Sequence, residues 1–345
     1  MLSSLWKSPP GAKGADPDPD PAAPLVSTWQ VRANAGEPQA IVRVRNLQSV
    51  MVAGRDAWGR SAKAQPVLLS SEVSFARPFE TASANDSVNT ETVHYGNLSK
   101  TLLGGIELFS PSSTSSTGAN AGAGAGAGAS KVGAGKVKRE DGGAPHTGDV
   151  FELLWVQMTG RVVDGSRVAL PMDQVPFLDA TKLRSLSLTL HLPKASLLGD
   201  GVSFTTSACF AENLAEEETK RNPLRSYARC LRIHGLRVPT LIGVNPNERQ
   251  AKQMVVVDVE IDRFDVREDI HTELEGAVVA TLEKSSFETL EALGTCIATQ
   301  ILDEFRIGGN PQRMRERGWQ VRVCLEKPIA VPFADCPCVE VRVGS

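Results

Sequence analysis

Four short segments of the sequence combine residue types that can exchange protons or hold a polar ring. They are TVHYG at 92–96, GVNPNERQAKQ at 243–253, FETLEALGTCIATQIL at 287–302 and VRVCLEKPIAVPFADCPCVEVRV at 321–343. Carboxylates can hold an N–H edge through charge-assisted hydrogen bonds, and lysine or tyrosine can act in general acid–base steps. Each segment alone is weak, because a strand-end lysine is usually solvated and a tyrosine usually packs in a half-buried position. In combination, the four segments are a fairly specific sign of a site that holds a polar ring and exchanges protons.

The histidines and cysteines give no metal or disulfide motif. Four histidines have no spacing typical of metal ligands: His94, His191, His234 and His271. The six cysteines contain no CxxC pair, and the single residue between Cys336 and Cys338 suits neither a zinc site nor a strain-free disulfide. We therefore expect reduced thiols and no metal site.

The composition excludes several classes of protein. The chain has 345 residues, with 37 Lys and Arg against 40 Asp and Glu, which gives a net charge of −3. It lacks the excess of cations that a nucleic-acid phosphate backbone requires. No apolar run approaches the ~18 residues that span a bilayer, and Pro9 and Pro10 interrupt the start before a signal peptide could form. We expect a cytoplasmic protein of about two domains, with neither nucleic acid nor membrane as a partner.

Alternating hydrophobic residues predict several half-buried strands. Clear alternation runs over 186–192, 255–261, 319–325 and 339–343, and a weaker version covers 67–75. Each repeat places one side chain in two toward a core, as antiparallel sheets with one covered face require.

Helical spacing lies between these predicted strands. Leu290, Leu293, Ile297, Ile301 and Phe305 fall on one helix face, and a shorter stripe over 278–282 precedes them. The second half thus has the order two strands, two helices, two strands, and the first half shows the same order. Segregated strands and helices predict an α+β fold with antiparallel sheets, built by internal duplication.

Composition shifts set the predicted domain boundaries. Residues 1–38 are rich in Pro, Ala, Gly and Asp and predict a disordered tail. A first domain covers 39–211 and contains a low-complexity Gly/Ala insertion at 110–148, which we interpret as a flexible loop. A charged linker at 212–224 leads to a second domain at 225–345.

The four segments resemble dihydroneopterin aldolase, together with DAWGRSAKAQ at 56–65, VFELL at 150–154 and LHLPKASLLGDGVSF at 190–204. The likeness covers both halves, as in the tandem pair of fungal folate proteins. It implies two tandem tunnelling-fold (ββααββ) domains whose antiparallel sheets close into an oligomeric barrel. It also implies a lyase that cleaves 7,8-dihydroneopterin by a retro-aldol reaction to 6-hydroxymethyl-7,8-dihydropterin and glycolaldehyde, in folate biosynthesis. Because the pterin ring is itself the electron sink, no metal and no cofactor is expected.

The resemblance also implies roles for individual residues. Glu291, next to Leu290, matches the glutamate that anchors the pterin ring, and both residues are predicted to bind substrate. Glu248 matches the carboxylate near the trihydroxypropyl chain. Lys327 matches the catalytic lysine, and Tyr95 matches the tyrosine that exchanges a proton with the substrate.

Each half departs from the family pattern. In the first half Glu152 aligns with the anchoring glutamate and Lys194 aligns loosely with the lysine, but Gly59 stands where the second carboxylate is expected. In the second half the chain reads Thr-Glu-Leu-Glu-Gly at 272–276, so Glu275 stands where the tyrosine is expected. Each half therefore lacks what the other retains.

These complementary losses predict one complete site, with Tyr95 from one domain and the glutamates and Lys327 from the other. In the family the site lies between neighbouring subunits. We expect a homo-oligomer, in which two chains form one ring and four chains form a stacked pair.

Two alternatives stay open at this point. A pterin-binding or scaffold protein of the same fold could have lost turnover, as the missing residues suggest. Another cofactor-free tunnelling-fold enzyme, such as a urate oxidase, is also a tandem chain, but TVHYG and Glu-Lys-Pro at 326–328 argue against it.

Overall fold

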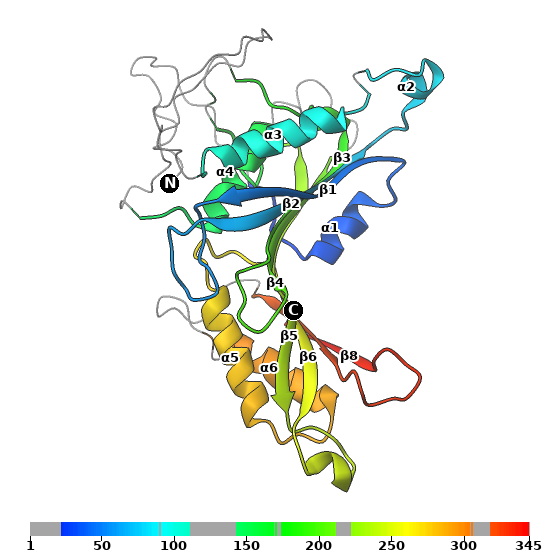
Figure 1. The fold of residues 1–345 in the computed structure, drawn as a ribbon. Coiled ribbons are helices and arrows are strands. Elements are labelled where there is room, and N and C mark those ends of the chain that lie inside the picture. Colours follow the sequence, from blue (N-terminus) through cyan, green and yellow to red (C-terminus); the bar gives the residue numbers. More distant parts are fainter. Residues whose placement is uncertain are drawn as a thin grey trace, which may run out of the picture.

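The structure is a computed structural model. Its eight strands form one antiparallel sheet, in which the order of neighbouring strands follows the sequence from β1 to β8 (Figure 1). The structure describes residues 22–89, 91–110, 143–168, 170, 174–211, 222–303, 305 and 318–344. The strands are β1 (Ala40–Met51), β2 (Gln65–Phe75), β3 (Leu183–Leu192), β4 (Gly201–Phe210), β5 (Leu224–Thr240), β6 (Gln253–Asp262), β7 (Gln320–Glu326) and β8 (Cys338–Val343).

Helices lie between the strand pairs in each half of the chain. They are α2 (Glu80–Ala84), α3 (Tyr95–Glu107) and α4 (Thr147–Thr159) in the first half, and α5 (His271–Lys284) and α6 (Leu290–Asp303) in the second. α3 packs against β1, α5 against β5, and α6 against β7 and β8. Two strands, a helical region and two strands therefore occur in each half, with two helices in the second half as predicted and the short α2 as an additional helix in the first.

The strand alternation arises because one face of the sheet is covered. In β6 the even-numbered side chains point to the opposite face of the sheet, while the odd-numbered ones, Val255, Val257, Val259 and Ile261, are fully buried. These residues share one hydrophobic cluster with the inward faces of α3 to α6. The predicted antiparallel α+β arrangement is confirmed. The five strands and the two second-half helices that the sequence pattern located match β2, β3, β6, β7, β8, α5 and α6.

The other face of the sheet is polar and carries cross-strand pairs. Arg232 is ion-paired with Asp258 at 2.9 Å, and Arg322 with Glu260 at 2.6 Å. Hydroxyls also pair across strands, as Thr189 and Thr205 do at 2.9 Å. Such pairs stabilise neighbouring strands on a face that no hydrophobic layer covers.

Residues 28–35 form a helix, so the prediction of a disordered tail over 1–38 is wrong for this part. Helix α1 (Thr28–Ala35) begins at an N-cap, Ser27, whose side chain accepts from the Gln30 N–H. The Asp262 carboxylate also accepts from the Thr28 N–H at 2.8 Å. Val31 packs in a small cluster on the polar face of β4 and β5. Two buried side chains and a cap outweigh the polar composition, and residues 1–21 lie outside the described part.

Two other predicted boundaries fall largely outside the described residues. Positions 111–142 of the Gly/Ala insertion and 212–221 of the linker are not described. The linker prediction of 212–224 ends one residue too late, because β5 already begins at Leu224. None of the described helices has the length and apolar character needed to cross a membrane.

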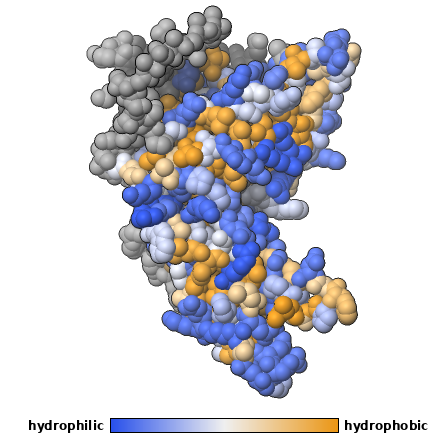
Figure 2. Space-filling view, viewed as in Figure 1, coloured by the Kyte–Doolittle hydropathy of each residue, from blue (hydrophilic) through white to orange (hydrophobic). Residues whose placement is uncertain are grey.

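The two edges of the sheet are β1 and β8, which belong to opposite halves of the chain. The loop between β7 and β8 projects from the β8 edge (Figure 1). Its side chains Ile329, Val331 and Phe333 are exposed, and the projection is hydrophobic in Figure 2. Open edges with exposed apolar side chains favour pairing with another chain.

Candidate active site

Glu248 and Lys327 form an ion pair at one end of the second half of the sheet. Lys327 follows β7 directly and is only 5% exposed. Glu248 lies in a 3-10 helix, Pro246–Arg249, in the loop that leads into β6. β6 and β7 are antiparallel neighbours, so the start of one and the end of the other meet at the same end of the sheet.

The backbone before Glu248 is shaped to hold its carboxylate. Oε2 of Glu248 accepts from the backbone N–H and from the side-chain amide of Asn245, both at 3.0 Å. Gly243 has a φ of +143°, and a Cβ there would lie 2.4 Å from the Glu248 Cβ. Only glycine permits this close approach at this backbone conformation.

Arg249 connects this loop to the N-terminal end of α6, where Glu291 lies. Its guanidinium donates to the carbonyls of Ser286 at 2.9 Å and Phe287 at 3.3 Å. Glu291 is in the first turn of α6 and is exposed, whereas Leu290 is half-buried against the core. One arginine thus links the loop that carries Glu248 to the segment that precedes α6.

The Lys327 ammonium lowers the pKa of Glu248 below its usual value, chiefly through the hydrogen bond between the two groups, with the Asn245 N–H adding to it. The carboxylate is therefore ionised at neutral pH. A buried ammonium beside a fixed carboxylate and an open carboxylate on α6 can hold a polar ring and move protons.

Tyr95, the fourth predicted residue, lies at the other edge of the molecule. It begins α3, which packs against β1, and its side chain is 68% exposed and stacked on His94. Lys327 follows β7, next to the β8 edge. The structure therefore brings Glu248 and Lys327 together within one chain and does not bring Tyr95 to them.

Glu152 and Lys194, the first-half counterparts of Glu291 and Lys327, lie at the joint between the two halves, where α4 and the loop after β3 meet the second half of the chain. Glu152 on α4 is buried, and its Oε1 accepts from the Val163 N–H at 3.0 Å. Burial raises the pKa of Glu152, against the opposing effect of that N–H and of the Arg229 guanidinium. The Lys194 side chain is exposed, and its carbonyl accepts from the Ala57 N–H at 3.3 Å. The Val163 N–H thus already binds one oxygen of the Glu152 carboxylate.

Glu275, on α5 of the second half, contacts the first half at the same joint. Its Oε1 accepts from the backbone N–H groups of Leu197 and Leu198, both at 3.0 Å. Nearby, Asp269 accepts from the Thr147 N–H at 3.2 Å and lies 3.0 Å from the His146 Nδ1. Sequence reasoning missed Asp269 and His146, because their partners are about 120 residues away and no local spacing signals the contact.

Comparison with known families bears on the readings that the sequence left open. Residues 231–343 match the dihydroneopterin aldolase family. The match contains Glu248, Glu291 and Lys327, so the resemblance predicted from the motifs is confirmed for this half. The folic acid synthesis protein fol1 of Schizosaccharomyces pombe is 24% identical over 193 residues. That alignment covers 52% of this chain and 22% of the yeast protein, so the chain spans about a fifth of this relative.

Solved structures show two kinds of likeness. The dihydroneopterin aldolase of E. coli, in complex with neopterin, is 25% identical over 33% of this chain and 98% of its own, with a TM-score of 0.28. A uricase from Bacillus fastidious covers 89% of this chain and 94% of its own at 7% identity, with a TM-score of 0.51. The urate oxidase of Bacillus sp. TB-90 gives 10% identity and a TM-score of 0.50. The uricases share the fold across both halves.

Proposed function

We propose that the chain is a dihydroneopterin aldolase, a lyase of folate biosynthesis whose substrate is 7,8-dihydroneopterin. The observation that carries the proposal is the Glu248–Lys327 ion pair, which lies inside the segment that matches the family. A buried lysine needs a partner, and this one has a carboxylate held in place by Asn245. Such fixed charge is what an acid–base reaction on a neutral ring requires.

The reaction needs one bond to break and one proton to move. The hydroxyl on the second side-chain carbon loses its proton, and the bond to the first side-chain carbon breaks as glycolaldehyde forms. The electron pair of that bond moves into the C=N bond of the pterin ring. The first side-chain carbon then takes up a proton, which gives 6-hydroxymethyl-7,8-dihydropterin.

Each site residue has a proposed role in this reaction. Glu291, exposed on the first turn of α6, accepts from the N–H edge of the ring. Glu248 orients the diol and holds the Lys327 ammonium, whose charge favours proton release through a bound water. Tyr95 exchanges the proton at the side chain. Leu290 packs beside the ring edge.

Tyr95 reaches this site only from a second copy of the chain. β1 and β8 are the two open edges, and pairing β8 of one chain with β1 of another brings α3 of the second chain toward β7 and β8 of the first. We infer that the tandem domains, 39–211 and 225–345, form a closed ring from two chains, and that two rings stack as a tetramer. The exposed Ile329 and Phe333 lie at this edge.

The joint within the chain is proposed to be structural. One oxygen of Glu152 and one oxygen of Glu275 already accept from backbone N–H groups of the protein, which supports a structural role for both carboxylates. In this proposal the two different domains that supply one site belong to neighbouring chains, with one site for each chain.

A turnover assay on 7,8-dihydroneopterin, read by fluorescence of the product, tests the proposal. Lys327→Ala should reduce turnover by about 10²–10⁴-fold, whereas Lys284→Ala, an exposed lysine at the end of α5, should not. Pterin binding without wild-type turnover would contradict the enzymatic function and leave a pterin-binding protein.

A further inference from the structure

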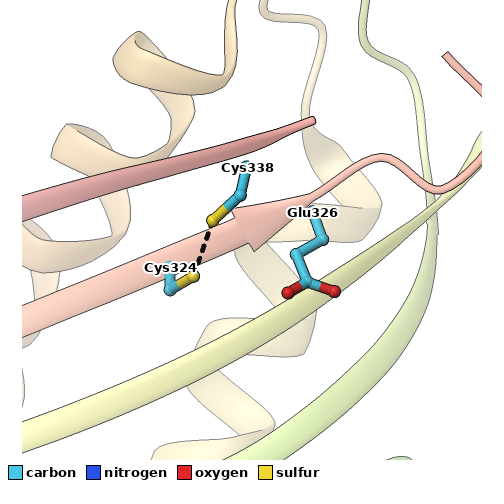
Figure 3. A group of neighbouring side chains, drawn as sticks. All are labelled: Cys324, Glu326 and Cys338. Atoms are coloured by element: carbon cyan, nitrogen blue, oxygen red, sulfur yellow. Dashed lines mark hydrogen bonds between the residues drawn. The ribbon is translucent and has the colours of Figure 1, made fainter. Parts of the chain in front are cut away.

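The polar face of the β7–β8 hairpin carries a cluster of thiols and a carboxylate outside the proposed active site (Figure 3). Cys324 and Glu326 lie on β7, and Glu326 pairs directly with Cys338, the first residue of β8. The sulfurs of Cys324 and Cys338 are 3.1 Å apart. These two sulfurs and a Glu326 oxygen all lie within 4.8 Å of one another. The antiparallel register thus brings together three groups that can bind a metal ion.

A third thiol lies beside the cluster. Cys336 lies two residues before Cys338 in the sequence, at the end of the loop that leads into β8. Cys336 and Cys338 were expected to form no metal site, because one intervening residue is too few for two ligands on a loop. The hairpin changes that expectation, since it adds Cys324 and Glu326 from the neighbouring strand. Two grouped thiols and a carboxylate, with a third thiol nearby in the sequence, form a donor set that Zn²⁺ can bind.

The placement of the two closest thiols favours a metal over a disulfide. Cys324 pairs with Glu340 and Cys338 with Glu326, so the two cysteines are diagonal neighbours. Diagonal Cα atoms in an antiparallel pair are about 7–8 Å apart, whereas a disulfide requires less than about 7 Å. Two thiolates on a tetrahedral Zn²⁺ at about 2.3 Å lie about 3.8 Å apart. Rotation of the exposed Cys338 provides the small opening required.

The charges around the cluster favour a cation. Asp258 on β6 lies directly opposite Cys324. Two arginines on this face are ion-paired with other carboxylates, Arg232 with Asp258 and Arg322 with Glu260. Glu326 makes no ion pair with any residue in the described part of the chain. Its carboxylate therefore has no fixed positive charge to neutralise it.

We propose that Cys324, Glu326, Cys336 and Cys338 bind a thiophilic divalent cation such as Zn²⁺. The ion would close the loop 327–337 at its base, where the Lys327 N–H donates to the Pro337 carbonyl at 3.2 Å. It would hold the backbone of this loop without contacting substrate. The proposal does not depend on the aldolase activity.

Titration of the reduced, metal-free full-length chain with Co²⁺ tests the site. We expect one equivalent to bind per chain, with a thiolate-to-cobalt charge-transfer band and the intense visible bands of a tetrahedral ion, and Zn²⁺ should displace it. Cys324→Ser and Cys338→Ser should each weaken binding by more than about 100-fold. Cys296→Ser, a half-buried thiol on α6, is the matched control and should bind normally.

A second measurement reports on the loop. Hydrogen–deuterium exchange in residues 327–337 should slow when Zn²⁺ is added to the wild type, and should not change in Cys324→Ser. Equal Co²⁺ binding by wild type and Cys324→Ser would show adventitious binding and overturn the site. So would a reduced chain that binds no Co²⁺ but links Cys324 to Cys338 on exposure to air.

Discussion

The Lys327 ammonium contacts the Glu248 carboxylate although 79 residues separate them in the sequence. The contact follows from the sheet, because Val256 at the start of β6 pairs with Glu326 at the end of β7. The loop before β6 and the residue after β7 therefore meet at one end. Gly243 and Asn245 then fix the carboxylate toward the lysine.

Glu248→Gln tests the role of this carboxylate. The amide keeps the shape but removes the charge, so the Lys327 ammonium stays buried without its partner. We expect turnover to fall by about 10²–10⁴-fold. Glu283→Gln, an exposed glutamate on α5, is the matched control and should keep wild-type turnover. Full activity of Glu248→Gln would remove this residue from the proposed site.

Gly243→Ala tests the packing of the loop. The added Cβ would meet the Glu248 Cβ at 2.4 Å, at a φ of +143° that strains any other residue. We expect a loss of roughly 1–3 kcal/mol in the free energy of unfolding, with reduced turnover. Gly104→Ala on α3, where a Cβ meets no atom within 4 Å, should instead stabilise by about 0.5–1 kcal/mol. Denaturant unfolding measures both, and equal effects would contradict the close approach.

His234 predicts a pH dependence of stability. Burial, helped by the Arg232 guanidinium, lowers the pKa of His234 from 6.5 to about 4. The unfolded chain then binds a proton between these values that the folded chain does not. Stability should be complete above about pH 6.5 and fall as the pH decreases toward 4, by at most about 1.4 kcal/mol per pH unit for one proton.

Denaturant unfolding from pH 4 to 7 checks this slope. In His234→Gln the slope should become shallower, because the titrating ring is gone while an amide can still pair with Ser203, which lies 2.6 Å from the His234 Nε2. An unchanged slope in His234→Gln would show that another group titrates.

Glu275→Ala tests whether Glu275 has a structural role or belongs to a second active site. The change leaves the Leu197 and Leu198 N–H groups without their acceptor and should destabilise the fold by about 1–3 kcal/mol. Glu275→Gln keeps an acceptor oxygen and should cost less. Turnover of the folded variants should match the wild type. A loss of turnover in Glu275→Gln at wild-type stability would give this carboxylate a chemical role.

The sequence was informative where the physical pattern is local. The alternation over 255–261 predicted β6, and the motifs identified Glu248 and Lys327 before their contact was known. Helix α1 was missed because its core contribution is small and the Asp262 carboxylate that accepts from its Thr28 N–H is 234 residues away. The contact between Cys324 and Cys338 was also missed, since it depends on the register of a hairpin.

The largest difference concerns Tyr95. The motif in the sequence named the residue, but which edge carries it depends on the order of all eight strands. That order is a property of the whole sheet, so the motifs assigned Tyr95 and Lys327 to different domains without showing that the two residues lie at opposite edges of one chain.

Mixing two inactive variants tests the central claim of a site shared between chains. Tyr95→Phe and Lys327→Ala each spoil every site in their own assemblies. In a two-fold ring that combines one chain of each, one of the two sites contains both native residues. Equal mixing with subunit exchange should therefore restore about a quarter of wild-type turnover of 7,8-dihydroneopterin. No recovery, despite mixed oligomers confirmed by native mass spectrometry, would contradict the shared site.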